Sequence, residues 1–242
     1  MNLLRFAGAA LAAALLAVPA MAADKDNTPP EGFTALFNGK DLTGWQGVVP
    51  INQRGKGNAN AAEKRQKVAN TKVLPHWTVI DGILTYDGKG DSLQSAKDFA
   101  DFELHVSWKI GKGGDSGLYL RGNPQVQIWD SENLSESLKA DWHTGSGGLW
   151  NNPAPPGTDP KKIGKTPLKK ADKPVGEWNE FKIVMKGDKV TIHLNDELVV
   201  DDAALANYWE KGKPLPATGP IELQHHGDKL WFKNIYVKEL PD

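Results

Sequence analysis

The feature that most constrains the fold is the alternation of apolar and polar residues along short segments of the chain. In the clearest segment, Phe102, Leu104, Val106 and Trp108 are separated by single polar residues. Successive side chains of a β-strand point to opposite faces, so this alternation predicts a strand with one buried face. Further short segments that we interpret as strands lie at 77–80, 83–86, 92–96, 118–130, 178–185, 189–194, 197–200, 219–226 and 230–239.

Turn residues stand between many of these segments. Asp81-Gly82 and Asn195-Asp196 each join two of them and predict tight hairpins. Many short strands with almost no helical periodicity favour an all-β, antiparallel sandwich or barrel. Because no domain linker is recognisable, we place a single β-sandwich domain at residues 32–242.

Three segments depart from the strand pattern. Residues 58–70 are rich in Ala, Lys, Glu and Gln and predict one exposed helix inside an insertion, 52–73. Residues 203–211 predict a second, short helix. Residues 131–176 contain many Gly, Pro, Ser and Lys residues, and a connection of that length is usually a functional loop or disordered.

The N-terminus has the composition of a secretory signal peptide. Arg5 precedes an apolar run, 6–18, and Ala20-Met21-Ala22 fits a small-residue cleavage site. We therefore expect a signal peptide at 1–22, cleaved near Ala22, and a flexible leader at 23–31. The apolar run is shorter than the ~20 residues that cross a bilayer, so we expect a periplasmic or secreted protein with no membrane partner after cleavage.

Composition excludes several classes of function. The chain has no cysteine, so it has no disulfide bond, no thiolate metal ligand and no cysteine nucleophile. Its 29 Lys and Arg residues nearly balance its 30 Asp and Glu residues. Since nucleic-acid binding needs an excess of positive charge, we expect no nucleic-acid partner.

Two segments about a hundred residues apart, 117–130 and 219–228, combine polar and aromatic residues at strand spacing. Hydrogen-bonding groups beside aromatic rings suit a sugar, which has hydroxyl groups at its rim and C–H faces for stacking. If the two segments bring their polar faces together, they form a concave sugar-binding surface. The candidates for that surface are Arg121, Gln127, Trp129, Asp130, Glu222, Gln224 and His226, with Trp142, Trp150 and Trp231 as further aromatic candidates.

Motifs of other enzyme classes are incomplete. The phrase Gly114-Asp-Ser-Gly117 is similar to that of trypsin-like proteases, but it merely enters a strand and favours a glycine-rich turn. The segment 87–91 lacks the downstream Glu of an EF-hand. No H-E-x-x-H zinc spacing occurs, although a metal site assembled from distant strands stays open. No Glu is followed two residues later by Asp, which disfavours the common retaining-glycosidase motif.

A set of phrases recurs in order along nearly the whole chain after the leader. They lie at 32–45, 76–82, 101–104, 116–121, 126–130, 145–152, 176–179 and 223–227. In these phrases the chain resembles the 3-keto-disaccharide hydrolase family. The resemblance implies an exported bacterial protein with a concanavalin-A-like antiparallel β-sandwich, or jelly roll, carrying a long loop insertion and one or two short helices.

Two positions depart from that family's pattern. Gln125 stands where the family often has Glu, so it cannot act as a carboxylate base. His225 stands where the family often has a small polar residue, and His226 is the position that matches the family's His-Gly.

The resemblance implies cleavage of glycosides already oxidised to a ketone at sugar carbon 3. The ketone acidifies the C–H bond at carbon 2, a base removes that proton, the group on carbon 1 leaves, and water adds to the unsaturated sugar. Such a route needs a base and groups that stabilise an enolate oxygen. We assign the base to His226 or Glu222, enolate stabilisation to Arg121, and hydroxyl binding to Gln127, Asp130 and Gln224. A divalent metal is a candidate for polarising the ketone, and its identity stays unknown.

Two other functions remain open from the sequence. One is a non-catalytic, lectin-like carbohydrate-binding module that uses the same surface. The other is an ordinary glycoside hydrolase that acts on unoxidised sugars.

Overall fold

The computed structural model describes residues 26–122, 125–133 and 144–241. The expected signal peptide and Trp142 lie outside these residues. Part of the expected flexible leader is instead anchored. The backbone N–H of Asn27 donates to Asn234 Oδ1 at 2.7 Å, and its side chain donates to the Gly82 carbonyl at 2.8 Å. Residues 26–27 therefore pack against the domain.

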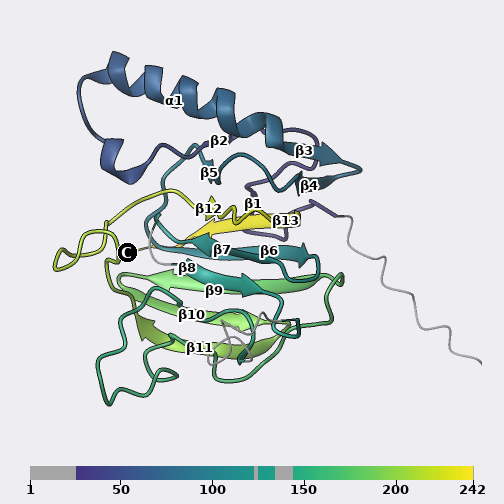
Figure 1. The fold of residues 1–242 in the computed structure, drawn as a ribbon, viewed down its shortest axis with the longest axis vertical. Coiled ribbons are helices and arrows are strands. Elements are labelled where there is room, and N and C mark those ends of the chain that lie inside the picture. Colours follow the sequence, from purple (N-terminus) through teal and green to yellow (C-terminus); the bar gives the residue numbers. More distant parts are fainter. Residues whose placement is uncertain (1–25, 123–124, 134–143, 242) are drawn as a thin grey trace, which may run out of the picture.

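The larger of two antiparallel sheets has eight strands (Figure 1). Its main path follows the order β11-β10-β9-β6-β13-β4-β3, and β1 pairs with the far end of β13. The strands are β1 (Thr34–Ala35), β3 (Trp77–Ile80), β4 (Ile83–Tyr86), β6 (Phe102–Ile110), β9 (Asn179–Lys186), β10 (Lys189–Leu194), β11 (Glu197–Ala204) and β13 (Leu230–Glu239).

The smaller sheet has five strands in the order β2-β5-β12-β7-β8. They are β2 (Trp45–Gly47), β5 (Leu93–Ser95), β7 (Asp115–Tyr119), β8 (Gln125–Trp129) and β12 (Glu222–Leu223). Strand β12 is a central strand although it is only two residues long. It brings the segment near residue 222 between β5 and β7, which both lie more than a hundred positions earlier in the chain.

The hydrophobic core lies between the two sheets. Leu104, Val106 and Trp108 of β6 are almost fully buried, and they belong to the same core cluster as Leu118 of β7 and Val126 of β8. The alternation in the sequence therefore reports which face of each strand is buried. The expected antiparallel β-sandwich of jelly-roll type is confirmed, and so are the hairpins at 81–82 and 195–196.

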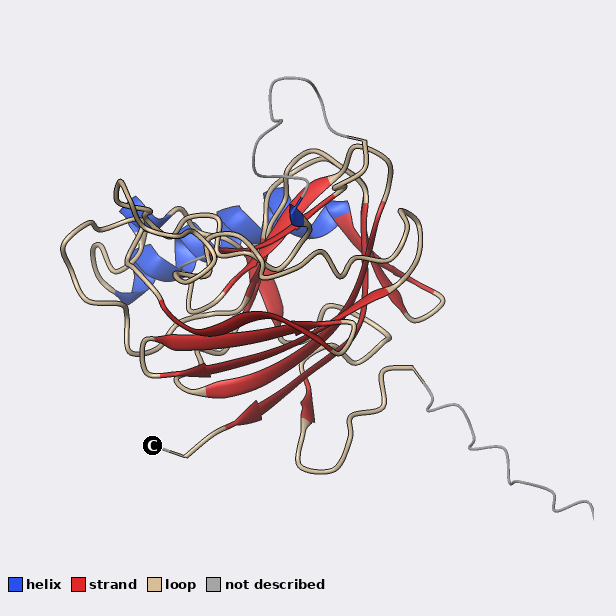
Figure 2. Ribbon diagram, turned by 90° about the horizontal axis from the view of Figure 1, so that it is seen from below, coloured by secondary structure: helices blue, strands red, loops and turns tan. Residues whose placement is uncertain are grey.

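One α-helix, α1 (Ala59–Val73), and two 3-10 turns, η1 (Ile51–Gln53) and η2 (Leu74–His76), complete the described part of the fold. Asn58 caps α1 by accepting a hydrogen bond from the Ala61 N–H. Figure 2 shows α1 on the opposite side of the molecule from the outer surface of the larger sheet. No helix among the described residues is long and apolar enough to span a membrane.

The short helix expected at 203–211 is wrong. Strand β11 continues to Ala204, and the residues after it form bends and turns. Ala203 is buried in the core, so the β11 pairing with β10 prevails over the weak helix propensity of this segment.

Candidate functional site

The outer surface of the smaller sheet is polar, because alternate residues of its strands point away from the core. Tyr119 lies opposite both Glu222 and Gln125, and Gly117 lies opposite Gln127. Glu222 also lies opposite Gln94 of β5. We call this surface the polar face; it comprises Gln94, Asp115, Tyr119, Gln125, Gln127, Glu222, Gln224 and His226.

Glutamine side chains form a hydrogen-bonded chain across the polar face. Gln125 Nε2 donates to Gln127 Oε1 at 2.8 Å and to Gln224 Oε1 at 2.7 Å. The Tyr119 hydroxyl lies 3.2 Å from Gln125 Oε1. A Cβ at Gly117 would lie only 2.6 Å from the Gln125 side chain, so the absence of a side chain there allows Gln125 to lie across β7. The chain of amides fixes the direction in which each group presents its donors and acceptors.

Asp115 and His226 end this chain at the β7 N-terminus. Gln127 Nε2 donates to Asp115 Oδ1 at 2.6 Å, and His226 Nδ1 lies 3.7 Å from Asp115 Oδ2. Burial raises the pKa of Asp115, although the charge of His226 opposes that shift. The His226 side chain is 57 % exposed, so it can reach a ligand at this end of the polar face.

Glu222 is the buried carboxylate at the centre of the sheet. Its residue exposure is only 8 %, and burial raises its pKa to about 7, against the opposing charge of Arg54. Arg54 Nη2 lies 3.7 Å from Glu222 Oε2 and 3.3 Å from Gln94 Oε1. A carboxylate with a pKa near neutrality, beside a cation, has the properties of a general acid or base.

Aromatic rings border the polar face. The rings of Tyr119 and Trp209 are 6.1 Å apart, and Trp209 is 46 % exposed. Trp209 and Arg54 also line a hollow of about 540 Å³ at the end of the sheet where β12 begins. Near the other edge, Trp129 and Trp150 meet edge to face at 5.4 Å. An exposed tryptophan beside hydrogen-bonding groups is suited to stacking on a sugar ring.

Arg121 does not join the polar face. It lies two residues beyond the end of β7, and its φ of 53° ends the alternation that the strand begins. Its guanidinium is engaged elsewhere. Nε donates to the Ala100 carbonyl at 2.7 Å, Nη1 to the Gly187 carbonyl at 2.9 Å, and Nη2 to Asp101 Oδ1 at 2.6 Å. This geometry describes a structural residue that links the two sheets, and it gives no support to the expected contact with an enolate.

Two other candidates also lie away from the polar face. Asp130 Oδ2 accepts a hydrogen bond from the Gly113 N–H, and Oδ1 accepts from the Glu132 and Asn133 N–H groups. Burial would raise the pKa of Asp130, but these hydrogen bonds outweigh it and lower the pKa. Trp231 lies in β13 between two core residues, so it faces outward from the larger sheet, where Lys109 Nζ is 5.0 Å from its ring.

Two residues that the structure adds to the candidate site, Arg54 and Trp209, were not predicted from the sequence. Arg54 lies in the segment expected to be an insertion, and Trp209 lies in the segment expected to be a helix. The available signals were an arginine five residues after the apolar pair Val48-Val49 and two adjacent aromatic residues at 208–209 in a polar segment. Neither signal indicates which strand the residue contacts.

Within the described ranges, no three His, Cys, Asp or Glu side chains group closely enough to hold a metal ion. Glu222 has an arginine as its charged neighbour at 3.7 Å, a partner that repels a cation. The described residues therefore do not fit a metal site at Glu222.

Several known proteins are similar to this chain in sequence or in structure. The chain is 28 % identical to a 3-keto-disaccharide hydrolase of Bacteroides thetaiotaomicron, over 87 % of this chain and 79 % of that protein. Two crystal structures from Parabacteroides distasonis, provisionally assigned as glycosyl hydrolases, are also similar. The first has a TM-score of 0.65 and 26 % identity, and the match covers 90 % of this chain and all of that chain. The second has a TM-score of 0.57 and 25 % identity, and the match covers 93 % of this chain and 94 % of that chain.

Fold, polar face and relatives together define a carbohydrate-active hydrolase, an enzyme that cleaves glycosidic bonds. The family follows from a match over residues 32–238. The chain belongs to the family of 3-keto-alpha-glucoside-1,2-lyase-like domains.

Proposed function

We propose that this protein is an exported enzyme that cleaves 3-keto-glycosides by deprotonation at C2, elimination of the C1 group and hydration. The observation that carries the proposal is Glu222, a buried carboxylate whose pKa is raised to about 7, next to Arg54. The family match and the relative named as a 3-keto-disaccharide hydrolase support the substrate class. The signal-peptide pattern at residues 1–22 supports export.

In the proposed reaction, Glu222 removes the C2 proton and the electron pair moves onto the ketone oxygen at C3. Arg54 stabilises the negative charge that develops there. When the enolate returns to the ketone, the C1–O bond breaks and the aglycone leaves as an alcohol after protonation. Water then adds at C1, C2 regains a proton, and the 3-keto-sugar is released. The amides of Gln125 and Gln224 hold hydroxyl groups of the sugar.

Glu222 is preferred to His226 as the base for two reasons. It is buried at the centre of the sheet, where water competes little for the proton, and it has a cation 3.7 Å away. His226 lies at the end of the polar face with a side chain that is 57 % exposed. We assign His226, held near Asp115, to orienting the substrate.

The test follows exchange of the C2 proton of methyl 3-keto-glucoside in D₂O by NMR, together with release of methanol. Glu222→Gln should slow both by about 10²–10⁴-fold, the usual contribution of a general base. His226→Ala should raise KM more than it lowers kcat. Trp231→Ala, on the outer surface of the larger sheet, is the matched control and should retain wild-type rates.

The pH profile provides a second measurement. The base acts when it is deprotonated, so kcat/KM should rise with pH and level off above a midpoint of about 7. Undiminished exchange by Glu222→Gln would remove Glu222 from the mechanism. If His226→Ala then abolished exchange, the base would be His226.

The alternatives predict different products. Binding of glycans with no exchange at C2 would identify a binding module. Release of sugar from unoxidised glycosides would identify an ordinary hydrolase, whose paired carboxylates lie about 5–9.5 Å apart. Glu222 lies opposite Tyr119 of β7, and Asp115 lies four residues earlier on the same strand. The backbones of Glu222 and Asp115 are therefore offset by about 13 Å along the strand direction. This spacing disfavours a paired mechanism between those two carboxyl groups.

A further inference from the structure

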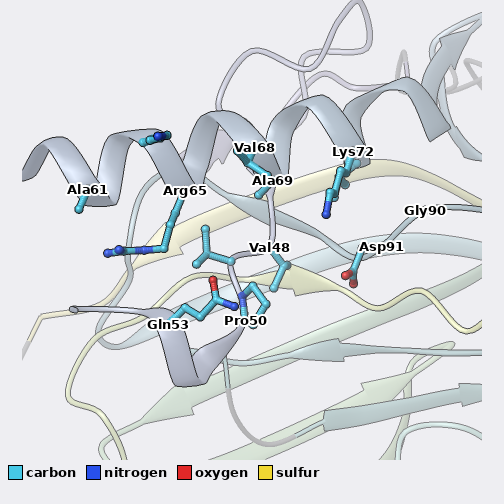
Figure 3. Close-up of a pocket in the computed structure, with 13 residues that line it drawn as sticks. Val48, Pro50, Gln53, Ala61, Arg65, Val68, Ala69, Lys72, Gly90 and Asp91 are labelled. Atoms are coloured by element: carbon cyan, nitrogen blue, oxygen red, sulfur yellow. The ribbon is translucent and has the colours of Figure 1, made fainter. Parts of the chain in front are cut away.

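Helix α1 forms one wall of a second hollow. This hollow has a volume of about 620 Å³ and lies between α1 and the chain at residues 48–53 and 90–91 (Figure 3). A volume of that size is within the usual range of small-molecule sites. The proposed reaction leaves it without a role.

The lining of the hollow combines an apolar surface with cations. Val48, Val49 and Pro50 form one side, and Val68 and Ala69 of α1 the other. Val68 is 48 % exposed, although it lies on the side of α1 that lines the hollow.

Three cations of α1 line the same hollow. These are Lys64, Arg65 and Lys72. Figure 3 shows Lys72 directed from the helix toward the space between Val48 and Asp91, and Arg65 Nη2 donates to the carbonyl of Lys56. Asp91 is the one acidic residue of the lining, and its Oδ1 is 3.2 Å from His225 Nε2. The lining is therefore apolar with a net positive charge, which complements an apolar group that carries a negative charge.

Two lining residues of the hollow, Asp91 and Val49, adjoin the catalytic groups. Asp91 lies near enough to Glu222 for its charge to act on that carboxyl group. On the other side, Arg54 Nε donates to the carbonyl of Val49 at 2.7 Å, while its Nη2 faces Glu222. For a sugar bound at Gln125 and Gln127 of β8, Glu222 and Arg54 would therefore lie between the sugar and helix α1.

We propose that this hollow binds the leaving group of the substrate, and that the leaving group is aromatic and carries a carboxylate or similar anion. The inference rests on the proposed function, because it assigns the far side of the bond that Glu222 and Arg54 cleave. The keto-sugar occupies the polar face, and the aglycone lies between α1 and residues 48–50.

The kinetic test compares 4-carboxyphenyl 3-keto-glucoside with methyl 3-keto-glucoside, using the ratio of their kcat/KM values. Lys72→Glu should lower this ratio about fivefold, the scale of a partly exposed charge pair. Lys67→Glu is the matched control, because Lys67 is on the same helix, is exposed and does not line the hollow; its ratio should stay at the wild-type value. The intrinsic leaving ability of the phenol cancels when variants are compared.

A binding arm keeps this test independent of catalysis. The probe is free 4-hydroxybenzoate, the phenol that the aryl substrate would release, measured by calorimetry and by NMR shifts of the α1 amides. Binding that Lys72→Glu weakens about fivefold and Lys67→Glu leaves unchanged supports the site, even if no keto-glucoside is turned over. Two results would overturn this inference and leave the proposed function standing. One is turnover in which Lys72→Glu and Lys67→Glu have the same ratio of kcat/KM values for the two substrates. The other is no binding of 4-hydroxybenzoate to the wild type.

Discussion

The chemistry of a single residue depends here on its surroundings. The side chain of Glu222 is chemically the same as that of any glutamate, but burial in the sheet removes it from water and raises its pKa from 4.5 to about 7. The opposite case is Arg121, whose type suggests an anion site although its donors are used by Ala100, Gly187 and Asp101. The residue types made both Glu222 and Arg121 candidates for the site. Their burial and their hydrogen bonds indicate a catalytic role for Glu222 and a structural role for Arg121.

The raised pKa of Glu222 also makes a prediction about stability. Glu222 keeps its proton up to about pH 7 in the folded state but loses it near 4.5 in the unfolded chain. The folded state therefore binds more protons in that window, and its stability falls as pH rises through it. Glu222→Gln should be more stable than the wild type at pH 8, by up to about 3 kcal/mol, and similar to it at pH 4.

Thermal unfolding of both proteins across pH 4–8 measures this difference. Lys67→Glu, which lies on the exposed side of α1, controls for general effects of charge. A constant difference between wild type and Glu222→Gln over the whole range would show that Glu222 ionises normally in the folded protein.

At the scale of elements, α1 completes the edge of the smaller sheet. Strand β2 is the edge strand, and its Gly47 exchanges hydrogen bonds with the helix instead of a strand. The Gly47 N–H donates to Asn70 Oδ1 at 2.9 Å, and Gln66 Nε2 donates to the Gly47 carbonyl at 2.7 Å. These contacts cover an exposed edge and hold α1 where it can wall the hollow.

Gly47→Ala should displace α1. A Cβ at this position would lie 2.7 Å from the Ala69 carbonyl oxygen and 2.8 Å from Val73 Cβ, so the helix must move. We expect a loss of about 1–3 kcal/mol in unfolding free energy and faster proteolysis within residues 54–73.

Gly111→Ala is the matched control for this substitution. Nothing lies within 4 Å of a Cβ there, and Gly111 has no positive φ, so its stability should stay the same or rise slightly. Equal stability of Gly47→Ala and the wild type would mean that α1 is not held against β2 as described.

At the scale of the whole molecule, Arg121 ties the two sheets together. It follows β7 of the smaller sheet, while Asp101 precedes β6 of the larger sheet and Gly187 stands in the turn between β9 and β10. Asp101 Oδ1 also accepts a hydrogen bond from the Gly187 N–H at 2.8 Å. The buried guanidinium therefore fixes the position of one end of the sandwich.

Arg121→Met should destabilise the protein while leaving turnover per folded molecule close to the wild-type value. Removing one partner of a buried ion pair typically costs about 3–5 kcal/mol, and chemical denaturation measures that loss. Arg54→Met is the contrasting variant, with a large loss of kcat and a small change in stability, because its side chain is 29 % exposed. Normal stability with lost turnover in Arg121→Met would return Arg121 to the active site.

The sequence predicted much of the fold because strand alternation and turn residues act locally. The segments at 77–86, 102–110, 178–200 and 230–239 and the helix near 58–70 all correspond to observed elements. It also placed Gln127, Glu222, Gln224 and His226 on one surface. It placed Arg121 wrongly there because a positive φ at one residue breaks the two-residue period, and such a local reversal is not visible in the pattern.

By itself, the sequence determined the class of fold, the buried face of each strand and the residue types of the site, since each depends on neighbours a few positions apart. Only the tertiary structure decided that Glu222 lies beside Arg54 and that α1 walls a hollow near them. Residue 54 meets residue 222, and residues 61–73 meet residues 48–50 and 90–91, only when the sheets assemble. The reason is physical: a pKa and a cavity depend on which distant groups exclude water from a point in space, and local sequence carries no record of that.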